Sequence, residues 1–347
     1  MAARLRDVAE LAGVSVKTVS NVVNNQPHIR AATRERVEAA IAELGYRPNL
    51  SARQLKNGRS GFLALVVPEI QSPYFADLGA KFSAAASERG FFTLFETTHG
   101  SLNSEETILR GLPRLAVDGI VFSPLVVDAA TIEERATQTP MALLGERAVP
   151  AGVPLVSVDS VRASRAMTDH LIGLGRRRIA AIGREVLDPQ GQATSSVRLR
   201  GYSQALTEAG LPLVDSLVVG VSEYSRRDGY RAMQQLLAMD EPPDAVFCFN
   251  DLMAMGAIRA CHEHGRRIPE DIAIAGFDNI PEGRFSVPTL TTIAPDMDAL
   301  VAAVLDELIP RINGTVARDH GARVHVPWSL EERESTVGAA ARTGSGD

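Results

Sequence analysis

The sequence is poor in cysteine, with only Cys248 and Cys261 among 347 residues. Their spacing fits no metal-binding motif, and they cannot build the disulfide framework of a small secreted domain. Apolar runs that approach the roughly 18 residues of a membrane-spanning helix are absent too. The N-terminus lacks the uninterrupted apolar stretch of a secretory signal. These absences exclude secreted and membrane-spanning classes and predict a cytoplasmic protein.

Signs of catalysis or of a cofactor are also missing. The seven histidines are scattered, and no recognisable nucleophile, metal set or carboxylate pair stands out. No glycine-rich dinucleotide motif and no phosphate-binding loop joins a strand-like to a helix-like segment, so no nucleotide cofactor is indicated. We therefore predict no catalytic residue, no metal and no cofactor. An enzyme on the same scaffold is the less favoured alternative.

What the chain does have is length and an uneven charge. At roughly 100–200 residues per domain, its length predicts two or three domains. The net charge of -6 conceals a basic start, because residues 1–60, the head, contain ten Lys or Arg and five Asp or Glu. The rest of the chain, the body, is acidic. This asymmetry indicates that the head alone contacts a polyanion, although chance segregation of charge would look the same.

The head contains a helix-turn-helix pattern. Apolar spacing predicts a helix over Leu5–Leu11, which Gly13 ends, and a second over Val16–Asn24 with Ser15 as its N-cap. A third helix is predicted over Thr33–Leu44. Two short helices joined by a tight glycine turn are typical of this motif, and a purely structural hairpin is the alternative. The polar outer face of the second helix suits base edges and phosphates, with Lys17, Thr18, Ser20, Asn21 and Asn24.

The body alternates short apolar strands with amphipathic helices. This alternation predicts parallel sheets covered by helices on both faces. Ligands gather at the carboxyl ends of the strands in such sheets. The predicted strands are Phe62–Val67, Phe91–Phe95, Gly119–Phe122, Met141–Leu144, Leu155–Val158, Ile179–Ile182, Leu217–Val219, Ala245–Phe249 and Ile272–Gly276.

Polar residues follow several of these strands. Asn250 comes directly after Ala245–Phe249, Asp278 comes just after Ile272–Gly276, and Arg198 opens a helix. One Asp at a strand end is usually a helix cap, but several convergent polar groups favour a ligand site. Arginine can bind two neighbouring hydroxyls or a carboxylate. With Asn and Asp, the set suits a polyol better than an apolar ligand.

Residues 4–58 resemble, almost position for position, the DNA-binding head and hinge of the LacI/GalR family of transcription factors. The resemblance implies a recognition helix over Val16–Asn24 that enters the major groove, with Val16, Lys17 and Asn21 contacting bases.

The resemblance also implies a hinge helix over Asn49–Asn57, which folds when two subunits pair on the operator. Leu55 would then wedge into the minor groove beside Ala52 and kink the DNA. From its residues alone, this segment is a plain linker as readily as a helix. The predicted DNA-binding residues are Ser15, Val16, Lys17, Thr18, Ser20, Asn21, Asn24, Asn49, Ala52 and Leu55.

Residues 61 to about 336 resemble the effector-binding core of the same family, most specifically in AVFCFNDLMAMGAIRA, IAIAGFDN, VPTLTTI and VPWSLEERES. The implied fold class is an N-terminal all-α helix-turn-helix head plus an α/β periplasmic-binding-protein-like (type I) core of two doubly wound parallel-sheet subdomains. The implied domains are a helix-turn-helix DNA-binding domain at 1–47, a hinge helix and linker at 48–60, an effector-binding and dimerisation core at 61–337 and a disordered tail at 338–347. Within the core, subdomain one would hold 61–160 plus 293–322, and subdomain two 161–292 plus 323–337.

The resemblance implies an effector in the cleft between the two subdomains. Matched to the family's motifs, its contacts fall on Arg198, Asn250 and Asp278. The weaker candidates are Tyr74, Phe75, Tyr224, Thr194 and Glu146. Tyr74 and Phe75 could instead start a helix, and Glu146 could pair with Arg147 at the surface. The set favours a sugar, and a purine or nucleoside is the alternative.

The resemblance further implies a homodimer that binds double-stranded, pseudo-palindromic operator DNA and represses transcription under effector control. No leucine heptad follows the final strand, so the tetramer-forming helix of some relatives is not expected. A sugar-binding protein without a DNA role would share the body but should lack the basic head.

Overall fold

The computed structural model describes residues 3–23, 28–46, 59–111, 117–147, 150–185, 193–317 and 321–338. Internal contacts divide the chain into two compact units between Gly61 and Phe62. These units are the head and the body, and each is described by itself. The predicted disordered tail lies outside the described residues apart from Gly338. None of the helices in the described ranges is long and apolar enough to cross a membrane.

The head is built on a small apolar core. Its helices are α1 (Leu5–Leu11), α2 (Val16–Val23) and α3 (Ala31–Leu44). Each helix contributes one completely buried valine, namely Val8 from α1, Val19 from α2 and Val37 from α3. Gly13, in the turn between α1 and α2, has a φ of 63°, a left-handed conformation that costs glycine little. The predicted helix-turn-helix fold is therefore confirmed.

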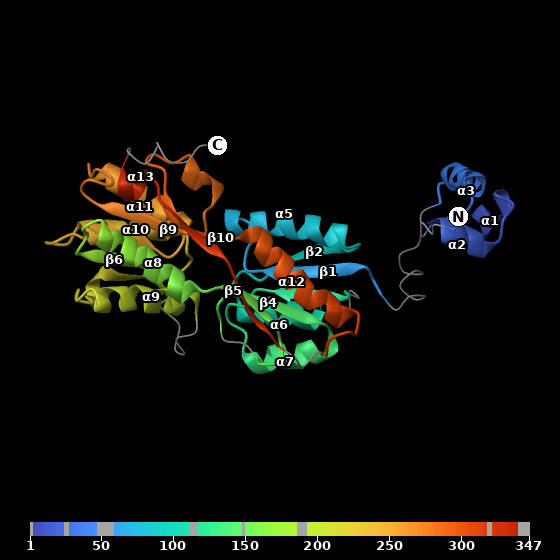
Figure 1. Ribbon diagram of the computed structural model, residues 1–347, viewed down its shortest axis with the longest axis horizontal. Helices are drawn as coiled ribbons and strands as arrows, with labels where there is room; N and C mark the ends of the chain where they lie inside the picture. Colours follow the sequence, from blue (N-terminus) through green and yellow to red (C-terminus); the bar gives the residue numbers. More distant parts are fainter. Residues whose placement is uncertain are drawn as a thin grey trace. The chain divides into compact units, whose positions relative to one another are not determined.

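The first of two six-stranded sheets in the body has the order β11-β5-β4-β3-β1-β2 and is parallel throughout. Its strands are β1 (Phe62–Val67), β2 (Phe92–Thr97), β3 (Gly119–Phe122), β4 (Met141–Leu144), β5 (Leu155–Val158) and β11 (Arg323–Val326). Its helices, which pack in two pairs on opposite faces (Figure 1), are α5 (Pro73–Glu88) with α12 (Met297–Ile312), and α6 (Leu102–Gly111) with α7 (Ala129–Gln138). Burial on both faces explains why the central strands are apolar throughout.

The second sheet has the order β12-β10-β9-β8-β6-β7. Its strands are β6 (Ile179–Glu185), β7 (Val218–Val221), β8 (Ala245–Cys248), β9 (Ala273–Phe277), β10 (Thr291–Pro295) and β12 (Trp328–Glu331). Its helices, again in two pairs (Figure 1), are α8 (Ser160–Gly173) with α9 (Thr194–Glu208), and α10 (Arg226–Leu237) with α11 (Asp251–Glu263). The short elements are η2 (Asp215–Leu217), η3 (Pro281–Arg284) and α13 (Glu334–Val337).

The second sheet departs from the predicted parallel arrangement at one edge. There β12 pairs with β10 in the antiparallel direction. The chain runs from β11 almost directly into β12, without a helix between them. The chain therefore passes from the first sheet into the second between these two strands.

Strand pairing contradicts two predicted boundaries inside the body. All of β10 lies in the second sheet, where it pairs with β9, although 293–295 was predicted for subdomain one. All of β11 pairs with β5 in the first sheet, although 323–326 was predicted for subdomain two. Short apolar strands look alike in sequence, and only their pairing partners decide which sheet they join. Subdomain one is therefore 62–158 plus 297–326, and subdomain two is 160–295 plus 328–337.

Candidate functional site

Helix α2 of the head has a buried and an exposed side. Val19 and Val22 pack into the head's core. Val16 is 45% exposed, and Lys17 beside it is exposed too. The remaining predicted base-facing residues on this helix, Thr18, Ser20 and Asn21, are half-buried. The side chains predicted to contact DNA thus project from a helix that is held by its opposite side.

Ser15 has a structural role at the start of α2. Its Oγ accepts a hydrogen bond from the backbone N–H of Thr18 at 3.1 Å and lies 2.8 Å from Oγ1 of the same residue. This satisfies an N–H that the first turn of a helix leaves free. The N-cap predicted at Ser15 is confirmed, while its DNA contact stays a prediction. Four other predicted DNA-binding residues lie outside the described residues, namely Asn24, Asn49, Ala52 and Leu55.

In the body, two of the predicted effector residues, Glu146 and Asp278, lie beside the guanidinium of Arg198. Arg198 lies on α9 and is only 7% exposed. Its Nη2 is 3.2 Å from Oε1 of Glu146 and 3.8 Å from Oδ1 of Asp278. Its Nη1 donates to the carbonyl oxygen of Phe249, and its Cζ lies 3.6 Å from the ring centroid of Phe277. Arg198 is therefore held by two carboxylates, a carbonyl and an aromatic face.

The packing of α9 fixes where Arg198 lies. Gly201, three residues further along α9, is in contact with the backbone of α8. A Cβ atom at Gly201 would lie 2.2 Å from the carbonyl oxygen of Val161, so any other residue would push the helices apart. This close approach holds the helical turn that carries Arg198.

Glu146 connects the two subdomains. It follows β4 in subdomain one, whereas Arg198 and Asp278 belong to subdomain two. Besides Arg198, its Oε1 accepts a hydrogen bond from Oγ of Ser160, the first residue of α8. Its side chain is only 8% exposed. The predicted alternative, a surface ion pair with Arg147, is therefore wrong, because Glu146 is buried against Arg198.

Asp278 has a largely buried carboxyl group on a strained backbone. Burial raises its pKa to about 7, with Glu146 adding to the rise and Arg198 opposing it. Its backbone has a φ of 109°, and Asn279 after it has a φ of 54°. Tyr224 has a positive φ as well, so three of the four such non-glycine residues in the described ranges lie near this site. Strain of this kind concentrates at functional sites.

Asp251 holds the loop that presents Asp278, and sequence reasoning missed it. Its carboxylate is completely buried and accepts hydrogen bonds from Oγ1 of Thr292 at 2.7 Å and from the N–H of Ile280 at 2.9 Å. Gly276 makes room for it, since a Cβ there would lie 2.1 Å from Asp251 Oδ1. The sequence shows a carboxylate directly after Asn250, but it does not show that this side chain points toward Ile280 and Thr292.

Asn250 is largely engaged within the protein. Its Oδ1 accepts from the N–H of Met253 at 2.8 Å and caps α11. Its Nδ2 donates to the carbonyl oxygen of Tyr224 at 2.9 Å. Asn250 therefore positions α11 and the Tyr224 backbone, and its predicted contact with the effector stays a prediction.

The aromatic candidates lie around the same charged group. Tyr74 makes an edge-to-face contact with Phe75, with ring centroids 5.1 Å apart. Burial raises the pKa of Tyr74, with Asp278 and Glu146 adding to the rise and Arg198 opposing it. The hydroxyl of Tyr224 donates to the carbonyl oxygen of Gly183 at 2.7 Å. The alternative role predicted for Tyr74 and Phe75, the start of a helix, is confirmed, because α5 begins at Pro73.

The last predicted effector residue, Thr194, is half-buried and is the first residue of α9. The helix therefore begins one turn before Arg198, and the prediction that Arg198 opens it is wrong. Next to Thr194, Ser195 is a residue that sequence reasoning missed. It is 1% exposed and lies three positions before Arg198, which places both on one face of α9. That spacing was available in the sequence as a signal.

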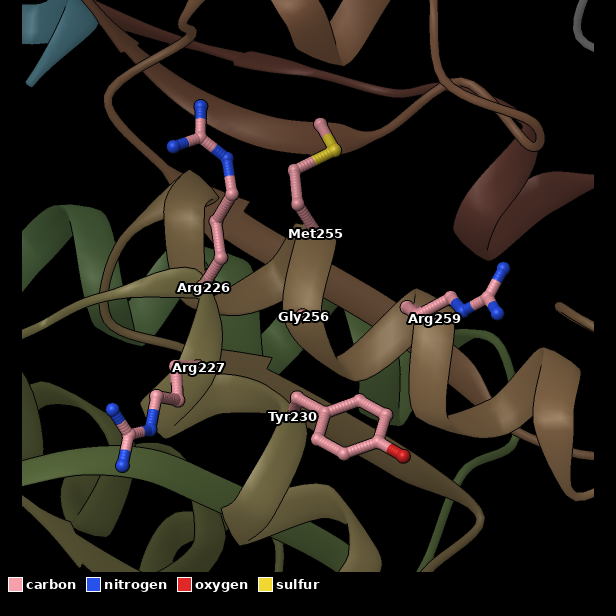
Figure 2. A pocket seen from close by; sticks show the side chains of 6 residues that line it. All are labelled: Arg226, Arg227, Tyr230, Met255, Gly256 and Arg259. Atoms are coloured by element: carbon pink, nitrogen blue, oxygen red, sulfur yellow. The ribbon is translucent and has the colours of Figure 1, made fainter.

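A separate groove of about 380 Å³ lies between α10 and α11, and Figure 2 shows its lining by Arg226, Arg227, Tyr230, Met255, Gly256 and Arg259. At Gly256 the helices touch through their backbones, since a Cβ there would lie 1.9 Å from the carbonyl oxygen of Arg226. Arg226 and Arg259 form ion pairs with Glu282 and Glu263. None of the predicted effector residues lines this groove, so it is not part of the candidate effector site.

No group of three or more His, Cys, Asp or Glu within the described ranges is arranged to hold a metal ion. The candidate site is thus a cluster of hydrogen-bonding and aromatic side chains, with one cation and two carboxyl groups at its centre.

Two family models match the chain. The model of bacterial regulatory proteins of the lacI family matches residues 4–49. The model of a periplasmic binding protein-like domain matches residues 168–336.

Individual proteins match over most of the chain. The HTH-type transcriptional repressor CytR of Escherichia coli (strain K12) is 35% identical over 295 residues, which are 84% of this chain and 85% of that protein. A transcriptional regulator CelR–cellobiose complex is 33% identical, covers 96% of this chain and 99% of its own, and has a TM-score of 0.71. The Lac repressor dimer bound to operator and the anti-inducer ONPF is 28% identical, covers 97% and 99%, and has a TM-score of 0.83. These relatives are transcription regulators and not enzymes.

Proposed function

Because the chain belongs to the lacI family of bacterial regulatory proteins and is a DNA-binding transcriptional repressor of that family, we propose that it acts as a cytoplasmic homodimer whose affinity for its operator is controlled by a sugar. Members of the family bind operator DNA and small-molecule effectors and act as dimers.

The DNA-binding half of the proposal rests on α2. Two copies of α2, one from each subunit, enter successive major grooves of a pseudo-palindromic operator. Val16, Lys17 and Asn21 set the sequence preference, and the basic side chains of the head contact phosphates. The predicted hinge helix at 49–57 completes the contact by placing Leu55 in the minor groove between the half-sites.

The effector half rests on one observation, the buried contact of Glu146 with Arg198. This contact joins the two subdomains at 3.2 Å. A ligand that exchanges its own hydrogen bonds for this contact changes how the subdomains are held, which gives it different affinities for the two arrangements. Sugar hydroxyls both donate and accept, as Arg198 and two carboxyl groups require. The relative found in complex with cellobiose supports a sugar.

The test is fluorescence anisotropy of the full-length protein on DNA from upstream of its own gene cluster, with and without a panel of sugars and nucleosides. We expect tighter binding to one upstream duplex than to random DNA. One sugar should change the affinity by about 5–150-fold, as is typical of allosteric coupling. Lys17→Ala should weaken DNA binding, and Arg198→Ala should abolish only the sugar response.

Two results would contradict the proposal. Equal affinity for upstream and random DNA would remove the sequence-specific repressor. A response to nucleosides alone would keep the repressor and replace the sugar.

A further inference from the structure

The loop of residues 279–290 joins the candidate effector site to the surface of subdomain two. It begins directly after Asp278 and ends where β10 begins. Near its middle, Phe285 is 84% exposed and Val287 is 90% exposed. Because so exposed a segment has few contacts to hold it, its first residues keep a fixed position only if the base of the loop is tied to the rest of the subdomain.

Arg333 ties the two ends of this loop together. Its Nη2 donates to Oδ1 of Asn279 at 2.7 Å, and its Nη1 donates to the carbonyl oxygen of Leu290 at 2.9 Å. The side chain of Arg333 is only 13% exposed. A planar guanidinium presents donors in fixed directions, so it can bridge two acceptors and hold the distance between them.

Arg333 is itself anchored to the second sheet. It lies between β12 and α13, and its backbone N–H donates to Oγ1 of Thr291 at 2.8 Å. The two residues after it are buried and bonded to the same stretch of chain. Glu334 accepts a hydrogen bond from the N–H of Thr289 at 3.0 Å, and Oγ of Ser335 accepts one from the N–H of Thr291 at 2.8 Å. The guanidinium therefore extends from a fixed backbone.

The first residues of the loop need this support because their backbone is strained. Asp278 has a φ of 109° and Asn279 a φ of 54°. Such angles persist in non-glycine residues only where the surroundings fix them. The N–H of Asp278 donates to the carbonyl oxygen of Ile293 at 2.9 Å, and the N–H of Asn279 donates to Oγ1 of Thr292 at 3.3 Å. Arg333 adds a hydrogen bond to the Asn279 side chain and so holds this residue from a second direction.

The direction of the Asp278 carboxylate depends on this backbone. Its Oδ1 lies 3.8 Å from Nη2 of Arg198. A rotation of the backbone at residues 278 and 279 would turn the carboxylate relative to Arg198. Whatever fixes Asn279 therefore also fixes where Asp278 points.

From these contacts we infer that Arg333 is a positioning residue for Asp278. By holding Asn279 against the far end of the loop, it fixes the direction in which the Asp278 carboxylate faces Arg198. The consequence for the effector response rests on the proposed function, whereas the positioning itself is measurable without an effector.

The test is a double-mutant cycle of the full-length protein in differential scanning calorimetry at pH 8. Asp278→Asn is made both in the wild type and in Arg333→Met, which removes the guanidinium but keeps an apolar stem. We expect the change in melting temperature caused by Asp278→Asn to differ between the two backgrounds by about 1 °C or more. A purely structural role of Arg333 would lower the melting temperature equally with either residue at position 278.

Asn279→Gly tests whether the effect passes through Asn279. Glycine accepts the left-handed backbone of this residue but offers no Oδ1. It should therefore alter the effect of Asp278→Asn as Arg333→Met does, and it provides the cycle if Arg333→Met does not fold. Arg284→Met is the matched control, because it removes the same charge from an exposed arginine of the same loop. It should leave the effect of Asp278→Asn unchanged.

The effector response is measured on the same variants by anisotropy on the operator. Arg333→Met and Asn279→Gly should each require about 10-fold more of the effective sugar, as expected for the loss of a hydrogen bond to a charged group. Their operator affinity without sugar should stay as in the wild type.

Additive melting temperatures in both the Arg333→Met and the Asn279→Gly cycle would overturn the inference. An equally large departure from additivity in the Arg284→Met control would overturn it too. If this happens while the wild type still responds to a sugar, only the inference about Arg333 has failed. If no sugar changes the operator affinity of the wild type, the proposed sugar control has failed, and the melting cycles still decide the role of Arg333.

Discussion

In the head, Val16 and Lys17 project from the exposed side of α2. In the body, by contrast, Arg198 and Glu146 are buried, Asp278 is largely buried, and the arginine forms an ion pair with each of the two carboxylates. DNA presents an extended surface that exposed side chains on a stable helix can meet. A small molecule must be enclosed, so the groups that bind it lose contact with water and need partners within the protein. Changes at the exposed side chains of α2 should therefore alter DNA affinity alone, whereas changes at the buried groups of the body should alter stability or the effector response.

The largest effect expected is the loss of the head with the body left intact. Val19 is completely buried in the head, so Val19→Asp places an unpaired charge in its core. The free energy of unfolding of the head should fall by about 4 kcal/mol or more. Specific operator binding should disappear in anisotropy measurements. The thermal shift of the body with its effector should stay as in the wild type. A lost shift would show that the two units do not act separately.

Two glycine substitutions compare the packing of the units directly. In Gly256→Ala, the new Cβ would lie 1.9 Å from the Arg226 carbonyl oxygen, so α10 and α11 must separate at a cost of about 3 kcal/mol. In Gly13→Ala nothing lies within 4 Å of the new Cβ, and only the left-handed backbone costs about 1 kcal/mol. Chemical denaturation should show the larger loss in the body transition. Equal losses would contradict the close helix contact.

Base recognition should be separable from the stability of the head. Asn21→Ala removes a predicted base contact, and we expect it to weaken operator binding by about 1–3 kcal/mol and to relax specificity at one position. Ser15→Ala removes the cap of α2 and should lower the stability of the head by about 1 kcal/mol. Anisotropy against a set of operator variants, together with thermal melting, distinguishes the two. An Asn21→Ala variant with unchanged specificity would remove Asn21 from the base-contacting set.

The smallest effect expected is a pH dependence in the body. Burial raises the pKa of Asp278 to about 7, above that of an unfolded chain, so the folded state keeps a proton that the unfolded state has lost. Stability from this group is present in acid and falls as the pH rises toward 7. Asp278→Asn, which stays neutral, should therefore melt higher than the wild type at pH 8 and lose most of that advantage near pH 4, where the unfolded carboxyl takes up its proton as well.

The charged and titratable groups that face Asp278 are Arg198, Glu146 and Tyr74, and Asp251 lies behind the loop that carries Asp278. Differential scanning calorimetry over the pH range measures the difference between variant and wild type. A variant that melts lower than the wild type at pH 8 would show that the attraction of Arg198 outweighs the burial of Asp278.

The sequence by itself determined the secondary structure and the chemistry of the candidate residues. The predicted bounds Leu5–Leu11, Phe62–Val67 and Met141–Leu144 agree with the structure, because apolar periodicity and glycine or proline stops are local signals. The family resemblance identified Arg198 and Asp278 as effector residues, and in the structure Nη2 of Arg198 lies 3.8 Å from Oδ1 of Asp278.

Only the tertiary structure decided which sheet β10 and β11 join, that Glu146 is buried rather than paired at the surface, and that Arg198 is already bonded on both Nη atoms. These facts depend on partners far apart in the sequence, such as Glu146 and Arg198. Periodicity and spacing describe neighbours along the chain, whereas burial and hydrogen-bond saturation are set by which distant segments pack together.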